Sequence, residues 1–545
     1  MDFRYSGCGL KGRERALQRF FEILPGATSW TILIGMTALA FGKPLIAAII
    51  IIAFYFYWLL RLIYMTLFLI ISYFRLSAEK NTDWMKRIRK LDDLDGYLDE
   101  LHARKPGGSF KKKISFLALR DEVRNLALKG GEKPLSTDIY QLVIIPVMKE
   151  TKEVIEPGIR SLYEGTFPSK QIIVALALEE RAKDEVKKGV EEVCASYRER
   201  FFDMFIVVHP DGIAGEAKAK GANTTFAAKK AAEYLTGKDI PYGNVISSCF
   251  DSDTVVTPDY FAALTYYYLT SPERDRASFQ PVPVYNNNIW DAPGITRVLE
   301  TGSSFFQLIE ATNPEKLVTF SSHSMSFKAL VDVGYWPVDM ISDDSAIFWK
   351  AFVHFDGRYH VVPMYATLSM DAVVAGTWWQ TVINVYKQKR RWAWGVENYP
   401  IIMRAFLKDK QISFFAKLKH SFKMFEGHIS WTTWAFLLTI IGWLPAIFAG
   451  RAFSHSVFYY SAPRIAGTIF NLASFSLITS IVLSLLLLPK KKERHHMLKR
   501  AVFACQWLLV PLTIVFLSAL PALDAQTRLM LGKYMTFWVT DKGRK

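Results

Sequence analysis

Long apolar runs at both ends of the chain enclose a central polar block. Apolar residues dominate four stretches, at 30–74, about 429–450, 465–488 and 501–522. A helix rises about 1.5 Å per residue, so about 20 residues cross the roughly 30 Å hydrocarbon core of a bilayer. The first stretch is too long for one such helix, and Gly42-Lys43-Pro44 interrupts it where a hairpin would turn. We therefore predict two membrane-spanning helices in 27–75, and two spans plus a third span or re-entrant element in 429–522.

Within the polar block, short apolar runs alternate with charged stretches of helical length. The strand candidates are 139–146, 171–178, 203–208 and 244–250, and the helical candidates between them are 152–163, 181–199 and 217–236. Strands that alternate with helices predict an α/β fold, with a mostly parallel sheet and helices on both faces. Ligands of such sheets bind beyond the carboxyl ends of the strands. The polar residues that follow these strands are therefore candidates for one site.

Composition and charge narrow the class of protein. Hydrophobic residues make up 51% of the chain and charged residues 22%, which is too apolar for an ordinary soluble enzyme and too charged for a pure membrane bundle. The net charge of +16 is compatible with nucleic-acid binding. However, basic runs such as Lys111-Lys112-Lys113 lie near apolar segments, as the positive-inside rule requires. We therefore predict a multi-pass protein of the cell (inner) membrane, with the polar block in the cytoplasm, a lipid bilayer as partner and no nucleic acid.

Two aspartates follow the strand candidate at 244–250. Asp251 and Asp253 are two residues apart, so their side chains point the same way on an extended backbone. Their hard oxygen ligands suit Mg²⁺ or Mn²⁺, which leave coordination positions for phosphate. An aspartate-rich turn without chemistry is the alternative. The preceding apolar strand favours a metal site.

Two further polar motifs fit a phosphate-bearing substrate. Lys218 and Lys220 lie in a glycine-containing segment before Asn223, where a lysine supplies a point charge to a diphosphate. Taken alone, a solvated helix start is the simpler interpretation of that segment. Asp343-Asp344 precedes an amphipathic helical stretch, and the field of a helix N-terminus favours a carboxylate there. Asp344 is a candidate general base, and plain helix capping is the alternative.

The segment 378–395 combines tryptophans with basic residues. It contains Gln388-Lys389-Arg390-Arg391-Trp392. An arginine can clamp a phosphate with two hydrogen bonds, and an indole face can stack on a sugar ring. A basic, aromatic helix at the membrane interface is the alternative, and this segment alone does not separate the two.

These motifs, in this order between membrane segments, resemble those of the membrane-integrated family 2 glycosyltransferases, the group that includes cellulose and hyaluronan synthases. That family pairs a GT-A nucleotide-sugar domain with a Gln-x-x-Arg-Trp motif. The resemblance covers about 138–395, the flanking spans and a C-terminal segment, Phe537 to Gly543, that is similar to the gating loop of bacterial cellulose synthases. It implies an inverting transferase that uses a nucleotide-diphosphate sugar, UDP-linked, together with Mg²⁺ or Mn²⁺.

The resemblance also implies roles by position. Asp251 would contact the nucleotide, Asp253 would bind the metal, and Asp344 matches the catalytic base. The other residues expected to hold the nucleotide sugar are Lys218, Lys220, Gln388, Arg391, Thr540 and Lys542. Trp392 is expected to bind the acceptor sugar.

The sequence departs from the family pattern at several points. Ser342-Asp343 replaces Thr-Glu before the expected base. The usual aspartate after the second strand is absent, and of its two neighbours Glu179 and Glu180 we take Glu180 as the candidate. No cyclic-dinucleotide-binding domain follows the tail, so regulation of that kind is not expected. A third full span at 501–522 would place the tail across the membrane from its ligand, but the basic residues of the tail favour the cytosol.

We expect a polymerase that extends a polysaccharide and passes it through the membrane. Transfer of one sugar to a lipid acceptor is the first alternative, and a catalytically inactive membrane scaffold or export partner is the second. The expected layout is an amphipathic cytosolic segment (1–26), two spans (27–75), a helical linker (76–137), the GT-A domain (138–377), interfacial helices with the Gln-x-x-Arg-Trp motif (378–428), a membrane region (429–522) and a gating-like tail (523–545).

Overall fold

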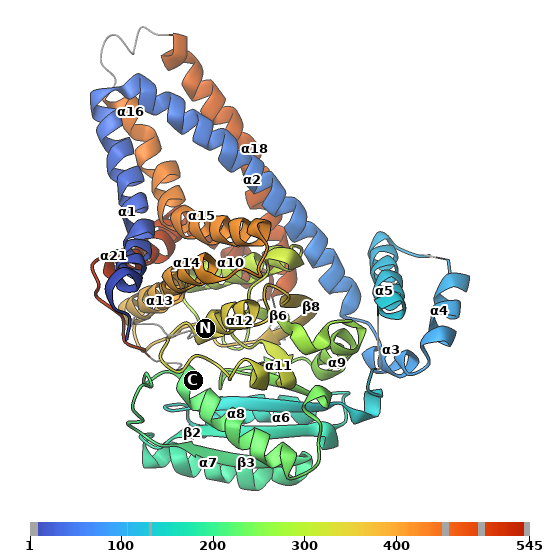
Figure 1. Ribbon diagram of the computed structural model, residues 1–545. Coiled ribbons are helices and arrows are strands. Elements are labelled where there is room, and N and C mark those ends of the chain that lie inside the picture. Colours follow the sequence, from blue (N-terminus) through green and yellow to red (C-terminus); the bar gives the residue numbers. More distant parts are fainter. Residues whose placement is uncertain (1–8, 106, 130–132, 449–456, 489–495, 539–545) are drawn as a thin grey trace.

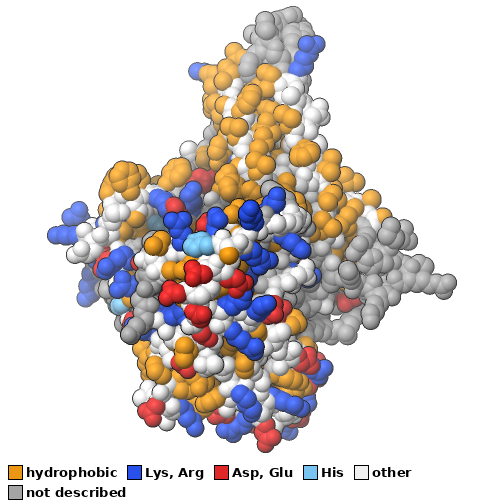
Figure 2. Space-filling model, turned by 90° about the vertical axis from the view of Figure 1, so that its right-hand side faces the viewer, with side chains coloured by type: hydrophobic (Ala, Val, Ile, Leu, Met, Phe, Trp, Pro, Cys, Tyr) orange, Lys and Arg blue, Asp and Glu red, His pale blue; other side chains and the backbone are white. Residues whose placement is uncertain are grey.

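The computed structural model describes residues 9–105, 107–129, 133–448, 457–488 and 496–538. The molecule has two tiers, an α/β domain and a set of long helices that project from one end of it (Figure 1). Figure 2 shows hydrophobic side chains covering the projecting helices, whereas Lys, Arg, Asp and Glu are interspersed over the domain. The two tiers therefore correspond to the apolar runs and the polar block of the sequence.

The domain is built on an eight-stranded mixed sheet. In spatial order the strands are β3 (Asp203–His209), β2 (Ile172–Glu179), β1 (Tyr140–Val147), β4 (Val245–Cys249), β7 (Ser324–Ser326), β6 (Ala277–Val284), β8 (His360–Ser369) and β5 (Val255–Val256). The first four strands are parallel, and β6 is parallel to β8. Strand β7 runs antiparallel to its neighbours β4 and β6, as β5 does to β8. The predicted mostly parallel sheet is thus confirmed.

Helices cover both faces of the sheet. They are α6 (Lys152–Tyr163), α7 (Asp184–Tyr197), α8 (Lys220–Thr236), α9 (Tyr260–Thr270), α10 (Gly294–Glu310), α11 (Phe327–Asp332) and α12 (Asp343–His354). On β1, Leu142 and Ile144 belong to the core with α8 and α12, whereas Val143 and Ile145 belong to the core with α6, α7 and α9. Because alternate side chains of a strand point to opposite faces, two covered faces require a continuous apolar run.

Four helices among the described residues are long and apolar enough to cross a membrane. They are α1 (Gly12–Gly42), α2 (Pro44–Glu79), the part Arg464–Leu487 of α18 (Val457–Leu487), and Ala501–Met530. A bent pair, α15 (Phe414–Thr439) with Ile441–Ile447, is a fifth candidate. The helix break predicted at Gly42-Lys43-Pro44 is present, because α1 ends at Gly42 and α2 begins at Pro44. The boundary predicted at residue 26 falls inside α1 instead, because the helix accommodates Pro25 without ending.

The predicted helical linker docks the end of α2 onto the domain. It contains α3 (Trp84–Leu91), α4 (Leu94–Ala103) and α5 (Phe110–Lys129). Arg75 on α2 pairs with Glu122 on α5 at 2.5 Å, and Tyr266 on α9 donates its hydroxyl hydrogen to the same carboxylate at 2.9 Å. These bonds connect the second candidate span to the α/β domain.

The last described helix returns to the α/β domain. Helices α13 (Trp378–Ala393), α14 (Asn398–Lys408) and α21 (Leu520–Met530) lie between the two tiers (Figure 1). Ala525 and Leu529 of α21 belong to the same apolar core as β1, and Arg390 of α13 pairs with Asp524 at 2.8 Å. This packing supports the interfacial or re-entrant alternative for 501–522, because the end of that segment lies on the domain.

Candidate active site

A pocket opens beyond the carboxyl ends of β1, β2 and β4, where ligands of a parallel sheet bind. It contains about 640 Å³ of empty space, part of which is open to solvent. The charged residues that line it are Glu150, Glu179, Arg181, Lys218, Lys220, Asp251 and Arg391. Cationic side chains from the start of α8, the end of β2 and α13 therefore converge on one space, as an anionic ligand such as a diphosphate requires.

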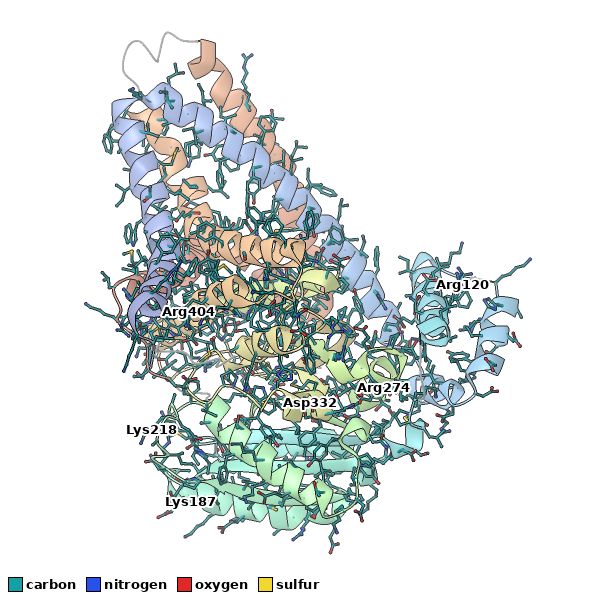
Figure 3. The ribbon with its side chains drawn as sticks, in the orientation of Figure 1. Arg120, Lys187, Lys218, Arg274, Asp332 and Arg404 are labelled. Carbon is teal, nitrogen blue, oxygen red and sulfur yellow. The ribbon has the colours of Figure 1, made fainter. Side chains whose placement is uncertain are left out.

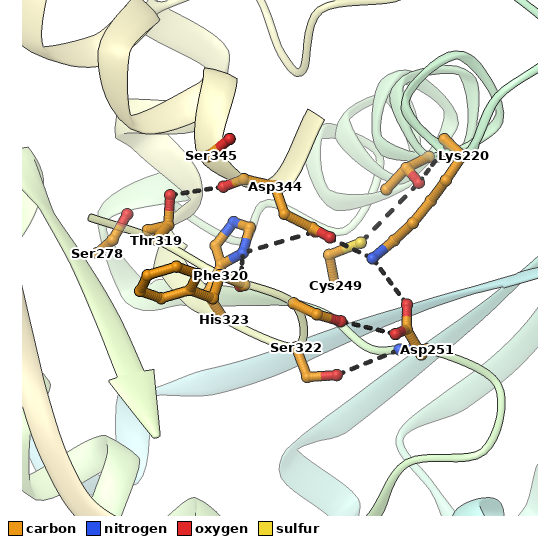
Figure 4. Close-up of polar contacts among 12 residues, drawn as sticks. Lys220, Cys249, Asp251, Ser278, Thr319, Phe320, Ser322, His323, Asp344 and Ser345 are labelled. Carbon is orange, nitrogen blue, oxygen red and sulfur yellow. Dashed lines mark hydrogen bonds and ion pairs between the residues drawn. The ribbon is translucent and has the colours of Figure 1, made fainter. Parts of the chain in front are cut away.

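Lys220 joins two aspartates beside this pocket (Figure 4). Its ammonium nitrogen lies 2.9 Å from Oδ1 of Asp251 and 3.0 Å from Oδ1 of Asp344. Burial alone would lower the pKa of Lys220, but the two carboxylates raise that pKa well above its usual value. The ammonium therefore stays charged and neutralises two carboxylates that would otherwise repel each other. The first residue of α8 thus brings the end of β4 together with the first turn of α12.

The loop before β7 holds the same two aspartates from another side. Ser321 donates its hydroxyl hydrogen to Oδ2 of Asp251 at 2.6 Å, and Thr319 donates to the backbone carbonyl of Asp344 at 2.6 Å. Ser322 adopts a φ of +60°, in the left-handed region, and its hydroxyl accepts the Asp251 backbone N–H at 3.4 Å. A non-glycine residue in this conformation costs free energy and is typical of functional sites. The loop thereby fixes the Asp251 carboxylate and the backbone of Asp344 relative to the pocket.

Asp343 lies beneath this cluster and is only 2% exposed. Burial, together with the charge of Asp344, raises the pKa of Asp343 to about 8, so this acid is protonated at neutral pH. Gly221 makes the arrangement possible. A Cβ atom on Gly221 would lie 2.4 Å from the Pro337 carbonyl oxygen and 3.0 Å from Cβ of Asp343. Any side chain at 221 would therefore push the start of α8 away from the start of α12.

Asp253, the predicted metal ligand, is fully buried and does not line the pocket. Its Oδ2 atom accepts the Asp371 backbone N–H at 2.8 Å, and its backbone carbonyl accepts an N–H of Asn287 at 2.9 Å. Asn287 also donates to the Asp371 carboxylate at 2.9 Å. These bonds tie the end of β4 to the end of β8, so Asp253 has a structural role here and its role as a metal ligand stays a prediction.

The site offers oxygen ligands for a divalent cation, but few of them. Asp251 presents its carboxylate to the pocket, and carboxylate oxygens are the ligands that Mg²⁺ and Mn²⁺ prefer. The part of the chain that the structure describes contains no group of three or more His, Cys, Asp or Glu residues arranged to hold a metal ion. Magnesium sites in nucleotide enzymes use one or two carboxylates and take their other ligands from phosphate and water. Asp251 fits a cation of that kind.

The Gln-x-x-Arg-Trp motif lies at the C-terminal end of α13. Arg391 lines the pocket. The ring of Trp392 lies 6.0 Å from the ring of Tyr285, and two such rings can receive the flat face of a sugar. Gln388 is buried and is not part of the pocket lining. The motif therefore reaches the pocket through Arg391 and the Tyr285 ring through Trp392, and the donor contact of Gln388 stays a prediction.

The described end of the tail lies against α13. Phe537 lines the pocket, and its ring centre is 5.1 Å from the Arg391 guanidinium. The Lys387 ammonium is 5.3 Å from the centre of the Trp538 ring. The tail is therefore on the same side of the molecule as the pocket, which is the side that a gating loop requires. Thr540 and Lys542 lie outside the described residues.

Two predicted donor ligands differ in their placement. Lys218 lines the pocket at the edge of the domain (Figure 3), where its side chain is 62% exposed and pairs with Asp211 at 2.8 Å. Glu180 accepts the Asp211 backbone N–H at 2.9 Å and is not part of the pocket lining, whereas Glu179 is. Successive side chains of a strand point to opposite faces, so a shift of one residue decides which carboxylate enters the pocket. Glu179 replaces Glu180 as the candidate.

Sequence reasoning missed buried polar contacts made by α13 and the turn after it. Lys389, inside the motif, pairs with Glu300 at 2.9 Å, and both side chains are almost fully buried. Its ammonium also lies 3.6 Å from the centre of the Trp392 ring. Glu397, five residues beyond the motif's tryptophan, contacts Ser342. The sequence groups Lys389 with the other basic residues of this segment and does not show that it is buried, and nothing in the sequence marks Glu397.

Comparison with known proteins identifies the family. A family profile described as glycosyl transferase family group 2 matches residues 248–520, half of the chain. The chain belongs to this family. A poly-beta-1,6-N-acetyl-D-glucosamine synthase of Staphylococcus epidermidis is 23% identical over 293 residues, which are 52% of this chain and 60% of the relative. The corresponding synthase of Staphylococcus aureus (strain COL) is 27% identical over 202 residues, 35% of this chain and 43% of the relative. The chain therefore spans about half the length of these relatives.

The chain also has similarity to solved structures, at low sequence identity. A mannosyltransferase from Pyrobaculum calidifontis, in complex with GDP-Man and Mn²⁺, has a TM-score of 0.37 at 15% identity, covering 79% of this chain and 99% of that one. S. aureus TarS in complex with UDP-GlcNAc has a TM-score of 0.35 at 13% identity, covering 69% of this chain and 91% of that one.

Family membership confirms that the chain is a glycosyltransferase, and with the sheet topology it confirms the predicted GT-A-like α/β domain flanked by apolar helices. The narrower predicted likeness to cellulose and hyaluronan synthases stays a prediction, because the two relatives described above are named as poly-beta-1,6-N-acetyl-D-glucosamine synthases.

Proposed function

We propose that this chain is a membrane-embedded inverting glycosyltransferase that transfers a sugar from a UDP-linked donor to a growing polysaccharide. The observation that carries the proposal is the contact of Lys220 with both Asp251 and Asp344 beside a pocket lined by cationic side chains. The names of the relatives make N-acetylglucosamine the first sugar to test. Processive extension with coupled secretion is part of the proposal, and transfer of one sugar to a lipid acceptor is the alternative.

In the proposed reaction, Asp344 is the general base. It takes the proton of the acceptor hydroxyl, whose oxygen attacks the anomeric carbon from the face opposite the diphosphate. A new carbon–oxygen bond forms, the bond from the anomeric carbon to the phosphate oxygen breaks, and the nucleoside diphosphate leaves with the electron pair. The position of Asp344 at the N-terminus of α12 supports this role, because the helix field stabilises the carboxylate before it accepts the proton.

The leaving diphosphate gains negative charge, which the pocket is suited to stabilise. Arg391 and Lys218 line the pocket from different segments and can bind its phosphate oxygens. Lys220, buried between two carboxylates, fixes the geometry of the site, and its contact with the nucleotide sugar stays a prediction. Asp251, with Asp253 if that side chain turns toward the pocket, would hold Mg²⁺ or Mn²⁺. That cation would supply further positive charge to the diphosphate when bound.

The proposed acceptor site lies at the other end of the motif. Trp392 and Tyr285 offer neighbouring aromatic faces for the terminal sugar of the acceptor.

We place the protein in the cell (inner) membrane as a multi-pass protein with the α/β domain in the cytoplasm, a proposal supported by its four candidate spans. The segment from Phe537 to Gly543 is proposed to close over the bound nucleotide, with Thr540 and Lys542 as its contacts, because Phe537 already lines the pocket.

The experiment that tests this proposal is a donor panel. Purified protein in detergent or nanodiscs is incubated with radiolabelled nucleotide sugars, beginning with UDP-N-acetylglucosamine, and the products are sized. A product that lengthens with time supports the polymerase. A single sugar on a lipid supports the alternative, and the absence of transfer from every donor would contradict both.

A further inference from the structure

We propose that Glu397 is a positioning residue that fixes the general base Asp344 relative to the motif on α13, a role that rests on the proposed function. Glu397 lies in the turn that follows α13 and is fully buried. Asp344 lies in the first turn of α12. The residue that connects them is Ser342, which immediately precedes α12.

The carboxylate of Glu397 accepts hydrogen bonds from both sides of this junction. The Ser342 backbone N–H donates to its Oε1 atom at 3.0 Å, and the Ser342 hydroxyl donates to the same oxygen. The Trp394 indole N–H donates to its Oε2 atom at 2.6 Å. In all three hydrogen bonds the carboxylate of Glu397 is the acceptor. This geometry suits an ionised carboxylate, which accepts on both oxygens.

Asn398, the residue after Glu397, also contacts Ser342. Asn398 donates from its amide to the hydroxyl oxygen of Ser342 at 3.2 Å and to that of Ser345 at 3.0 Å. Ser345 in turn donates to the backbone carbonyl of Ser342 at 3.1 Å. Glu397, in the turn after α13, and Asn398, the first residue of α14, therefore hold the residues on both sides of Asp344.

The Ser342 hydroxyl does not cap α12, although Ser342 is the N-cap residue of that helix. A serine at the N-cap of a helix usually accepts a backbone N–H of the first turn, which stabilises the helix. Ser342 is the N-cap of α12 but makes no such bond, because its hydroxyl is directed to Glu397 and Asn398 instead. Plain helix capping, the alternative for this motif, therefore does not explain the serine.

Burial of Glu397 is also unfavourable for stability alone. Among the described residues, Glu397 forms no ion pair with a cationic side chain. Burial raises its pKa to about 7, although the bonds from Ser342 and Trp394 lower it. An apolar side chain of similar size would avoid this cost. Since α13 carries Arg391 and Trp392, the contact fixes the distance from the base to the residues proposed for donor and acceptor.

Four variants and a control test the inference. They are Glu397→Gln, Ser342→Ala, the double variant and Ser342→Thr, with Glu122→Gln as a partly buried, hydrogen-bonded glutamate that does not line the pocket. For each, kcat is measured at saturating nucleotide sugar, the donor Kd by nucleotide titration, and folding by thermal unfolding. We expect Glu397→Gln and Ser342→Ala each to lower kcat by about 10- to 100-fold, the size of effect that misplacement of a reacting group has, with the donor Kd changed less than about twofold.

The double variant and the two serine variants decide the outcome. The kcat of the double variant is expected to fall no further than that of Glu397→Gln alone. The two substitutions break the same contact, so their effects do not add. Ser342→Thr keeps the hydroxyl and should keep most of kcat, and Glu122→Gln should leave kcat unchanged. Losses that multiply in the double variant, or a fall in donor affinity as large as that in kcat, would overturn the inference. If Glu397→Gln does not fold, the comparison of Ser342→Ala with Ser342→Thr tests the inference. Equal kcat values for these two variants would overturn it. Wild-type protein that transfers no sugar would instead contradict the proposed function.

Discussion

The ammonium nitrogen of Lys220 lies 3.0 Å from Oδ1 of Asp344. This contact ties the start of α8 to the start of α12, and the second contact of the same ammonium, with Asp251, extends the tie to the end of β4. Lys220 therefore connects the candidate base, Asp344, to Asp251, the residue expected to contact the nucleotide, and the two carboxylates share one cation. Charge changes at any of the three residues should therefore affect the other two.

Removal of Lys220 should cost both stability and activity. In Lys220→Met, Asp251 and Asp344 lose their shared cation, and we expect a loss of about 2–4 kcal/mol in unfolding free energy because both carboxylates are only partly exposed. The matched control is Lys218→Met, whose side chain is 62% exposed. It should cost less than about 1 kcal/mol but weaken nucleotide binding. Thermal unfolding and nucleotide titration check both, and equal losses of stability would show that the bridge is unimportant.

Asp343 should make stability depend on pH. Its pKa is about 8 in the folded protein and near the ordinary 3.8 in the unfolded chain. Below about pH 4 both states are protonated and its stabilising contribution is fully present. That contribution is lost as the pH rises toward 8, because the unfolded chain releases the proton more readily. Asp343→Asn should therefore gain stability relative to wild type between pH 5 and about 8, as measured by thermal unfolding. Asp184→Asn replaces an exposed carboxylate and is the control. Its stability should change with pH as that of wild type does.

Transfer should require Mg²⁺ or Mn²⁺. Excess chelator is expected to abolish turnover, and either cation should restore it. Asp251→Asn should weaken Mn²⁺ binding in the presence of UDP, measured by electron paramagnetic resonance, because Asp251 faces the pocket. Asp253→Asn should mainly lower stability, since the charged acceptor of the Asp371 backbone N–H is replaced by a neutral amide. Full turnover in chelator would refute the metal requirement. If Asp253→Asn abolishes Mn²⁺ binding in a stable protein, Asp253 is a ligand and turns to the pocket with the donor.

Loss of the tail should impair transfer more than folding. Truncation before Phe537 removes an aromatic ring from the pocket but little apolar packing, so the protein should still fold. Turnover should fall because the loop that excludes water from the bound diphosphate is missing. Thr540→Ala with Lys542→Ala should reproduce most of that defect. A cysteine at Gly543 should be protected from a membrane-impermeant thiol reagent in intact cells, and labelling from outside would exclude a gating role.

The sequence predicts those elements whose burial pattern is local. The continuous apolar runs of β1 and β2 correspond to strands covered on both faces, and helix α6 (Lys152–Tyr163) begins and ends where the pattern predicts. Strand β7, Ser324–Ser326, has only three residues, all with polar or flexible side chains. Its place between β4 and β6 depends on pairing with distant strands, which no local pattern encodes.

The site is predictable to the level of motifs and not of side-chain placement. Asp251, Lys218 and Arg391 line one pocket, as residues beyond parallel strand ends should. The same pattern cannot tell that Asp253 turns into the core, where it accepts the Asp371 backbone N–H. It also does not show that Glu397 contacts Ser342, because the two residues meet only when α12 and α13 pack.

The most direct test of the central claim compares wild-type protein with Asp344→Asn in the same transfer assay. Both are purified, and both are given radiolabelled UDP-N-acetylglucosamine and acceptor, with UDP affinity measured in parallel. We predict that wild type forms a labelled product that grows with time, whereas Asp344→Asn binds UDP with similar affinity but transfers sugar about 10²–10⁴ times more slowly. Transfer by Asp344→Asn at the wild-type rate would contradict the account, because the base would then be another residue.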